Sequence, residues 1–584
     1  MAVPTIPSSS LGTAHVSSAA LQDLGARPRR TQRRPIKQAT YELTNHAKAY
    51  LEGGQLSSGF DFLSNLLSAG TSISTPAKPY LGFLAPPAYL AFAASAVVDP
   101  TFTTQARSSY TREGADAALR YLQCVQVTVD RPAYPTIKSA FSFPAERTRR
   151  RFTGHRSAAV SPSPDLGGDI ERISGVDANE SSLWYRAEDF WHIVGWAFNC
   201  SVVHEKRWER WRLWLRVLLD FLETDWDFCV KLGTADEANT VSILKESLIW
   251  YYIAGDAANI NRSARRRIVK AVLAAASADS CKEYPEIWGR ETAELRRKRE
   301  SDQPLTEVDF ENGDMGDYDS DEPLLDSSVG EQVLHDHQPV ARNIEEASKG
   351  LGGTDAIALR QRLISLLARV AIALPAHFTT LSDFFDNVLE DFNSLPITHF
   401  QVLLSTLSMS PLVQLAFNAN LLLPLVTGKI PDYFRYDPPQ EQFESKLLPL
   451  RATSQSFVVN ARVSLILEQM FLQMMRRDDA LVSTITLREA VERGIAARQG
   501  VHGTARGKKS NAAEEEHAKE VMAASSERLF GLLEILEIRA RHSSPSTPEK
   551  MKGDSNSALR SFTSGSSLSP APDSDTDMED ESMQ

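Results

Sequence analysis

The sequence predicts an all-α protein: an irregular helical repeat, in the style of a HEAT or armadillo solenoid, with disordered termini and a long acidic disordered linker. Three observations lead to this prediction. Apolar residues recur at helical spacing over most of the chain, strand-like alternation is almost absent, and polar low-complexity segments separate the apolar blocks. Helical pairs bury their apolar stripes by stacking on one another, and because no fixed period of sequence identity occurs, we expect an irregular array.

Composition divides the 584 residues into folded and disordered segments. Segments with few large apolar residues cannot offset the entropy of ordering, so we expect them to be disordered. The folded segments are a first helical block at 40–140, a Trp-rich helical block at 181–299 and a third helical block at 350–540 with a flexible loop at about 498–513. The disordered segments are a basic N-terminal segment at 1–39, a Ser-, Pro- and Arg-rich loop at 141–180, an acidic linker at 300–349 and a Ser-rich acidic tail at 541–584.

Amphipathic stripes define the individual helices. The first stripe of the Trp-rich block joins residues at gaps of three and four, namely Trp184, Ala187, Trp191, Val194 and Phe198. The second stripe of that block consists of Trp208, Trp211, Leu215, Leu218 and Leu222. Three stripes of the third block run over 359–374, 381–392 and 463–474. A last helix near 514–540 begins with glutamates and ends with arginines, as its dipole favours.

Two uncharged stretches, 80–98 and 392–428, are long enough to cross a membrane. The first has Pro86 and Pro87 at its centre, and the second is divided by three prolines and punctuated by polar residues. A proline breaks helical hydrogen bonds, and lipid offers no replacement for them. We therefore expect buried helical hairpins and no membrane partner.

The net charge of −12 is concentrated in one segment. Residues 300–346 hold fifteen acidic side chains and one basic side chain, so the rest of the chain is close to neutral. Asp317, Asp319 and Asp321 alternate as in a calcium-binding loop, but Glu322 stands where the tight turn needs glycine. We expect a solvated acidic spacer and no metal site.

All nine tryptophans lie between residues 184 and 288. One interpretation is a tightly packed hydrophobic centre, because several of them lie on the two stripes of that block. The other is an aromatic and basic interaction surface around a tryptophan that lies off the second stripe. This candidate surface consists of Trp214, Arg207, Arg210, Arg212 and Arg216. Acidic residues at helical spacing from these arginines favour the packed interpretation.

Short basic clusters lie in predicted loops and helix ends, where import receptors read them. The candidate nuclear-targeting residues are Arg27, Arg29, Arg30, Arg33, Arg34 and Lys37 near the start, and Arg296, Arg297, Lys298 and Arg299 after the Trp-rich block. Direct nucleic-acid binding is possible but not favoured, because the chain is acidic overall and has no recognised nucleic-acid-binding module. The four cysteines are scattered, which fits a reducing compartment. We expect a nuclear protein.

Several serines and threonines precede a proline in the polar segments. The candidate phosphorylation sites are Ser161, Ser163, Ser544, Thr547 and Ser569. Each phosphate would add a charge of about −2 and could control docking through pairing with arginine. We expect a phosphoprotein.

Signatures of catalysis and of cofactor binding are missing or broken. A glycine-rich segment approaches a phosphate-binding loop, but only three residues separate Gly503 from Gly507. His192 lies beside Glu188 and Asp189, yet it adjoins an apolar stripe, so a packed or hydrogen-bonded histidine is preferred to an acid–base group. We expect no catalytic residue, no cofactor and no enzyme, with a site assembled from dispersed residues as a third alternative.

These features predict a non-enzymatic nuclear helical scaffold or adaptor. It would mediate protein–protein interactions in a chromosome-maintenance or transcription assembly, with the disordered segments as regulated docking sites and other proteins as partners. The alternative is an RNA-associated helical protein in ribosome assembly or RNA processing, which would use the basic clusters and the Trp-rich block.

Overall fold

The computed structural model of the protein describes residues 33–70, 78, 80–130, 134–144, 172–255, 260–293, 343–426, 438–477, 481–503 and 509–543. Most of these residues are helical, which confirms the predicted all-α class. Two three-residue strands, β1 (Ile36–Gln38) and β2 (Gly82–Leu84), pair in parallel near the start of the described chain.

The helices fall on either side of the acidic linker. Those before it are α2 (Tyr41–Glu52), α3 (Leu56–Ser68), α4 (Pro87–Ala96), α5 (Ser109–Thr128), α6 (Tyr134–Ala140), α8 (Leu183–Arg186), α9 (Phe190–Val203), α10 (Glu205–Ala235), α11 (Thr240–Lys245), α12 (Leu248–Ala254), α13 (Arg262–Leu273) and α14 (Ala278–Glu283). Those after it are α15 (Ile344–Gly350), α16 (Gly353–Ala373), α17 (Leu381–Phe392), α18 (Ile397–Thr406), α19 (Pro411–Leu422), α20 (Gln440–Gln442), α21 (Phe457–Met475), α22 (Ile485–Gln499) and α23 (Lys509–Ser543). Two 3-10 turns, Glu237–Asn239 and Leu423–Leu425, and a π-helical turn, Phe443–Leu447, complete the described helical segments.

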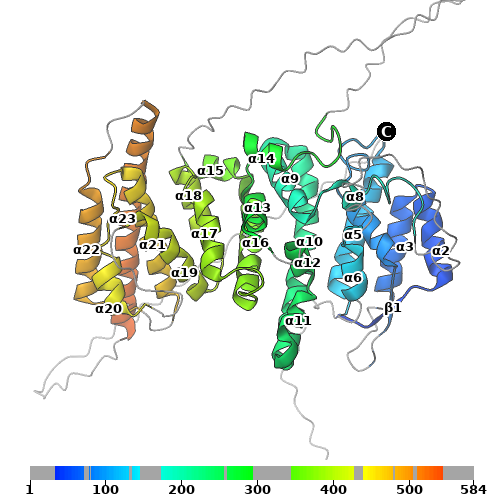
Figure 1. Ribbon diagram of the computed structural model, residues 1–584, viewed down its shortest axis with the longest axis horizontal. Coiled ribbons are helices and arrows are strands. Elements are labelled where there is room, and N and C mark those ends of the chain that lie inside the picture. The colour runs from blue at the N-terminus through cyan, green and yellow to red at the C-terminus, as the bar shows by residue number, and fades with distance from the viewer. Residues whose placement is uncertain are drawn as a thin grey trace, which may run out of the picture.

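The first helices of the chain lie at one end of the longest axis of the molecule and the last helices at the other end (Figure 1). Helices α2 and α3 lie at one end, α10 and α16 in the middle, and α21, α22 and α23 at the other end. One continuous hydrophobic core joins these elements, from Ala47 in α2 to Leu536 in α23. The three predicted helical blocks therefore share a single core.

Helix α10 is the central element, because it packs against α5 on one side and against α16 on the other. On the α5 side, Arg210 forms an ion pair with Asp116. On the α16 side, three ion pairs follow one another along both helices: Arg212–Asp355 at 2.6 Å, Glu223–Arg362 at 2.7 Å and Asp227–Arg369. Since the residue numbers rise together in the two helices, α10 and α16 run parallel.

The predicted stripes are confirmed, with one correction. Every residue of the second Trp stripe is buried on α10, and the three stripes of the third block lie on α16, α17 and α21. The first Trp stripe, however, is divided between two helices, because α8 ends at Arg186 and α9 begins at Phe190. The Asp189 carboxylate accepts a hydrogen bond from the backbone N–H of His192 at 2.7 Å and so caps a new helix start.

Several segment boundaries differ from the predicted ones. Residues 33–38, expected to be disordered, belong to the fold, because β1 pairs with β2 and Arg34 forms a backbone bridge with Val129. Helix α15 begins at Ile344, inside the predicted linker, because the Asn343 side chain caps it. Much of the predicted disorder falls on residues 1–32, 145–171, 294–342 and 544–584, which lie outside the described residues.

The two uncharged stretches form short elements within the core. The first contains β2 and α4, and the second contains α18 and α19. Their prolines divide them as expected, since Pro87 and Pro411 each occupy the first position of a helix, where a missing N–H costs nothing. Every helix among the described residues is too short or too polar to cross a membrane.

Candidate interaction site

The predicted interaction surface around Trp214 is wrong, because Trp214 is only 2% exposed. Its indole N–H donates to the Ala94 carbonyl at 2.9 Å, and its ring packs against the rings of Trp184 and Trp211. Helices α4 and α8 contribute Ala94 and Trp184, so they cover the part of α10 that lies off the predicted stripe. The packed hydrophobic centre is confirmed: eight of the nine tryptophans are buried, and Trp250 is half-buried.

The four arginines of that predicted surface connect helices within the fold. Arg207 is buried, and Arg210 reaches Asp116 of α5. Arg212 and Arg216 both bind the Asp355 carboxylate of α16, at 2.6 and 3.3 Å. These charges are matched by carboxylates of the same chain, so they form no open basic groove. The RNA-associated alternative thereby loses the aromatic platform on which it partly depended.

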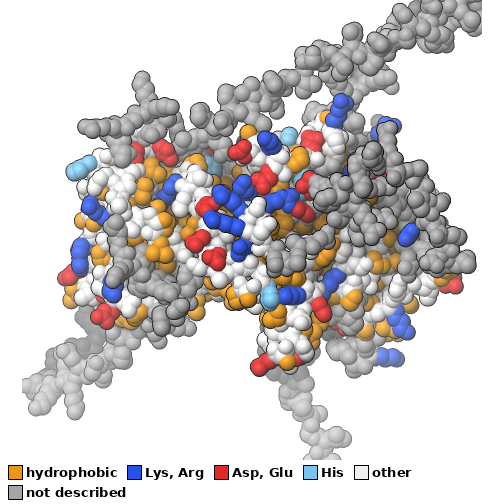
Figure 2. All heavy atoms as spheres, viewed as in Figure 1, with side chains coloured by type: hydrophobic (Ala, Val, Ile, Leu, Met, Phe, Trp, Pro, Cys, Tyr) orange, Lys and Arg blue, Asp and Glu red, His pale blue; other side chains and the backbone are white. Residues whose placement is uncertain are grey.

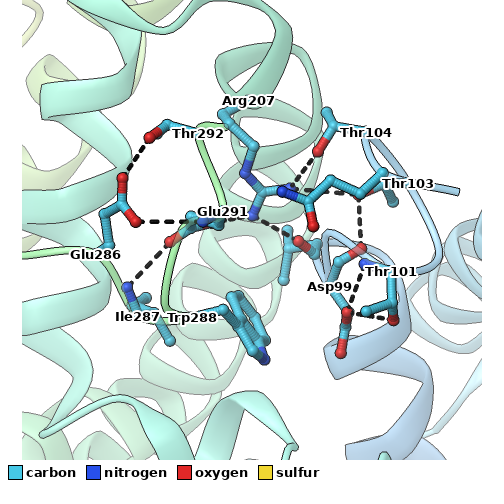
Figure 3. Close-up of polar contacts among 12 residues, drawn as sticks. Asp99, Thr101, Thr103, Thr104, Arg207, Glu286, Ile287, Trp288, Glu291 and Thr292 are labelled. Atoms are coloured by element: carbon cyan, nitrogen blue, oxygen red, sulfur yellow. Dashed lines mark hydrogen bonds and ion pairs between the residues drawn. The ribbon is translucent and has the colours of Figure 1, made fainter. Parts of the chain in front are cut away.

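A buried ionic cluster joins α10 to the connection between α4 and α5 (Figure 3). Arg207, near the start of α10, donates to the Val98 carbonyl at 2.7 Å and to Thr103 Oγ1 at 3.2 Å. Its guanidinium also forms an ion pair with Glu291, which lies in the segment after α14. Glu291 Oε1 accepts a further hydrogen bond from the backbone N–H of Ile287 at 3.0 Å.

This cluster has the properties of a structural clamp. The side chains of Arg207 and Glu291 are 2% and 0% exposed, so a substrate has no access to them. Burial raises the pKa of Glu291, although the positive charge of Arg207 opposes the shift. Nearby, one Asp99 carboxylate oxygen accepts from the backbone N–H and the hydroxyl of Thr101, which fixes the turn after α4. The clamp therefore sets the position of α10.

His192 is hydrogen-bonded at both ring nitrogens, as predicted for a packed histidine. Nδ1 accepts from the backbone N–H of Glu188 at 3.0 Å, and Nε2 lies 2.8 Å from the Pro285 carbonyl. The neutral tautomer with its proton on Nε2 satisfies both contacts. Burial lowers the pKa of His192, while the charges of Glu188 and Asp189 oppose this shift. These contacts indicate a structural histidine.

Acidification should therefore destabilise the fold through His192. The native state holds the neutral imidazole and the unfolded state takes up the proton, so the free energy of unfolding should fall as the pH drops below about 6.5. His192→Gln should reduce this slope by up to about 1.4 kcal/mol per pH unit, whereas His377→Gln, at an exposed position, should leave it unchanged. Urea denaturation between pH 5 and 7.5 measures both slopes, and equal slopes for wild type and His192→Gln would contradict the prediction.

Three of the candidate nuclear-targeting residues lie within the described structure. Arg33 donates to the Tyr134 hydroxyl at 2.8 Å, and Lys37 is exposed in β1. Arg34 is buried and donates to the Ala69 carbonyl at 2.7 Å, so folding removes it from any basic cluster that a receptor reads. The remaining candidates lie outside the described residues: Arg27, Arg29, Arg30, Arg296, Arg297, Lys298 and Arg299 for targeting, and Ser161, Ser163, Ser544, Thr547 and Ser569 for phosphorylation.

A cleft of about 430 Å³ lies between helices α13 and α14 on one side and α16, α17 and α18 on the other. We call it the α13–α18 cleft. Its walls come from residues 270–284 and 351–403, which flank the acidic linker in sequence. Basic and acidic side chains are intermixed in the middle of the face that Figure 2 shows, where α13 and α17 lie. Arg262 and Arg266 of α13 pair with Glu390 of α17.

Asp391 provides an unmet hydrogen-bond acceptor in this cleft. Its Oδ2 atom is buried and has no hydrogen-bond partner among the described residues. Burial raises the pKa of Asp391, while the positive charges of Arg266 and Lys270 oppose the shift. Lys270 is itself paired with Glu283, at 3.2 Å. The partly exposed Asp391 side chain therefore adds a negative charge to the wall of the cleft.

Arg360 lies beneath the floor of the cleft and is 0% exposed. It donates to the carbonyls of Val272 and Ala274 at 2.8 and 2.7 Å, and its guanidinium carbon lies 4.1 Å from the centroid of the Phe198 ring. Burial lowers the pKa of Arg360 to about 9. Because Arg360 is covered on all sides, it joins α16 to the end of α13 and leaves ligand contact to the other residues.

No local pattern in the sequence indicates the cleft. Its polar residues are spread over separate helices, and neither Asp391 nor Lys270 belongs to a recognisable motif. Within the described ranges, no group of three or more His, Cys, Asp or Glu side chains is placed to hold a metal ion. Comparison with protein-family models, with curated proteins and with solved structures found no match to this chain. The function is therefore inferred from the site itself.

Proposed function

We propose that this protein is a non-enzymatic nuclear scaffold or adaptor, built as an irregular helical solenoid, that holds protein partners in a chromosome-maintenance or transcription assembly. The observation that carries the proposal is the contrast between two kinds of polar group. His192 and the Arg207–Glu291 pair are buried and hydrogen-bonded within the fold. Asp391, in contrast, is partly exposed and lines a cleft large enough for side chains of a partner.

The architecture supports the solenoid part of the proposal. Helices α10 and α16 pack in parallel, although several helices and the acidic linker separate them in sequence. A single hydrophobic core runs through the helices from one end of the molecule to the other. Such an arrangement exposes a large surface per residue, which suits the binding of several proteins. The nuclear part depends on the basic clusters, above all on Arg296, Arg297, Lys298 and Arg299.

Affinity purification of the tagged full-length protein, from nuclear and cytoplasmic fractions and with or without nuclease, tests the proposal. We expect a stoichiometric set of protein partners in the nuclear fraction that survives nuclease treatment. The matched variant has alanine at all four positions from Arg296 to Arg299 and should be depleted from the nucleus. Partners that vanish with ribonuclease would overturn the proposal in favour of the RNA-associated alternative, and a cytosolic wild-type protein would overturn its nuclear part.

A further inference from the structure

We propose that the α13–α18 cleft binds a short peptide segment of a partner protein that carries a basic side chain next to apolar side chains. This inference rests on the scaffold function proposed above and names the chemistry of the partner. Three features of the cleft support it: the charge that it presents, the Asp391 carboxylate on its wall, and the apolar side chains beside Asp391.

The charged side chains that line the cleft favour a cationic ligand. Among the described residues that line it, Asp279, Glu283 and Asp391 contribute three carboxylates, and Lys270 is the one accessible cation. The Lys270 ammonium already pairs with Glu283 at 3.2 Å. Arg360 is fully covered, and Arg266, next to the cleft, pairs with Glu390 at 2.9 Å. A phosphate or a carboxylate would therefore meet like charge, whereas a lysine or arginine side chain would meet opposite charge.

The Asp391 carboxylate is the group that such a cation would bind. Asp391 lines the cleft and is partly exposed, although its Oδ2 atom is buried. An ammonium or guanidinium group in the cleft would be attracted to this carboxylate, and ion-paired contacts of this kind are the stronger class of hydrogen bond. The Asp391 side chain thus supplies negative charge on the wall where a basic side chain would lie.

Apolar side chains next to Asp391 would hold the rest of the segment. Leu395 and Pro396 follow it along the chain, and Leu273 faces the same cleft from the end of α13. These three residues are partly exposed, so a partner side chain would bury apolar surface that now contacts water. A volume of about 430 Å³ lies within the range of ligand sites and exceeds that of a single side chain.

Fluorescence anisotropy with the purified full-length protein tests this proposal. The probe is a fluorescein-labelled peptide that has an arginine between two leucines, flanked by glycine and serine. Its partner peptide has glutamate in place of the arginine. We expect the arginine peptide to bind at least about tenfold more tightly than the glutamate peptide, with a dependence on salt that reflects charge pairing. Equal affinities for the two peptides would overturn the proposal.

Two cleft variants and one control variant test whether the arginine peptide binds in the α13–α18 cleft. Asp391→Asn removes the charge with almost no change of shape, and Leu395→Ser removes an apolar contact. Each should weaken binding of the arginine peptide about tenfold. Asp386→Asn changes a carboxylate to an amide on the same helix but outside the cleft, and it should leave the affinity within about twofold. Circular dichroism confirms that each variant is folded. Affinities that are the same for Asp391→Asn, Leu395→Ser and Asp386→Asn would exclude the cleft.

The main competing occupant is the basic segment Arg296 to Arg299 of the same chain, which directly precedes the acidic linker. If it filled the cleft, deletion of these four residues would raise the affinity for the arginine peptide more than about tenfold. That result would show that the basic segment of the same chain, and not a partner protein, occupies the cleft. We expect the deletion to leave the affinity unchanged. If the two peptides bind with equal affinity but the nuclear partners still co-purify, the cleft is excluded as the peptide-binding site. The proposed scaffold function would not be affected by that result.

Discussion

Glu291→Ala should lower the free energy of unfolding by about 3–5 kcal/mol. The substitution removes the carboxylate that neutralises Arg207 in a position where the arginine side chain is only 2% exposed. An uncompensated buried cation is far less stable than a buried ion pair, because water cannot solvate it. The backbone N–H of Ile287 also loses its acceptor. Urea denaturation followed by tryptophan fluorescence measures the change, since eight tryptophans lie in the core.

Two further variants distinguish the effect of the unpaired Arg207 charge from that of a general weakening of the packing. Arg210→Ala, three residues further along α10, breaks a partly exposed ion pair with Asp116 and should cost at most about 1 kcal/mol. The double variant Arg207→Met/Glu291→Leu removes both charges and should recover most of the stability lost in Glu291→Ala. A loss for Glu291→Ala no larger than that for Arg210→Ala would show that the cluster is not the clamp described above.

Gly494→Ala should destabilise the protein by about 2–3 kcal/mol, although alanine favours helices. Gly494 lies in the middle of α22, and a Cβ atom there would lie only 2.0 Å from the carbonyl oxygen of Leu448. The backbone of the π-helical turn would have to move away. That movement would also disturb Arg498, which donates to the carbonyls of Leu448 and Leu450 at 2.9 Å. Thermal and urea denaturation measure the loss.

Gly531→Ala is the matched control for that substitution. Gly531 is also a glycine within a long helix, α23, but apart from its chain neighbours and the adjacent backbone of its own helix no atom of the described residues lies within 4 Å of the place where its Cβ would be. Here only the helix propensity changes, so the free energy of unfolding should rise by about 0.5–1 kcal/mol. The same substitution should thus lower the free energy of unfolding at Gly494 and raise it at Gly531. A stabilised Gly494→Ala variant would contradict the close approach of α22 to Leu448.

Much of the helical structure could be predicted because it depends on local spacing. Helices α10, α16, α17 and α21 each carry an apolar stripe with a period near 3.6, and the stripe identifies the helix whatever it packs against. The division between α8 and α9 was missed for the opposite reason. Trp184 and Trp191 continue one stripe in sequence, but the Asp189 side chain starts a new helix between them, and a period cannot reveal a change of helix direction.

The candidate site was not predictable in the same way. The α13–α18 cleft takes its walls from residues 270–284 and 351–403, and nothing in either segment indicates the other as its neighbour. The unmet acceptor at Asp391 is a property of its surroundings, because an aspartate in the same helix next to water would be solvated. The residues that did attract notice in the sequence, Trp214 and Arg207, form core contacts and a clamp.

By itself the sequence determined the helical class, the course of the main helices and the division of the chain by acidic and Ser-rich segments, because periodicity and composition are local. Only the tertiary structure decided which side chains are exposed. Trp214 is buried because α4 and α8 pack over it, and Arg34 is buried because β1 joins the fold. Burial, ion-pair partners and clefts depend on which helices become neighbours and in which register, and that choice is made by packing over the whole chain.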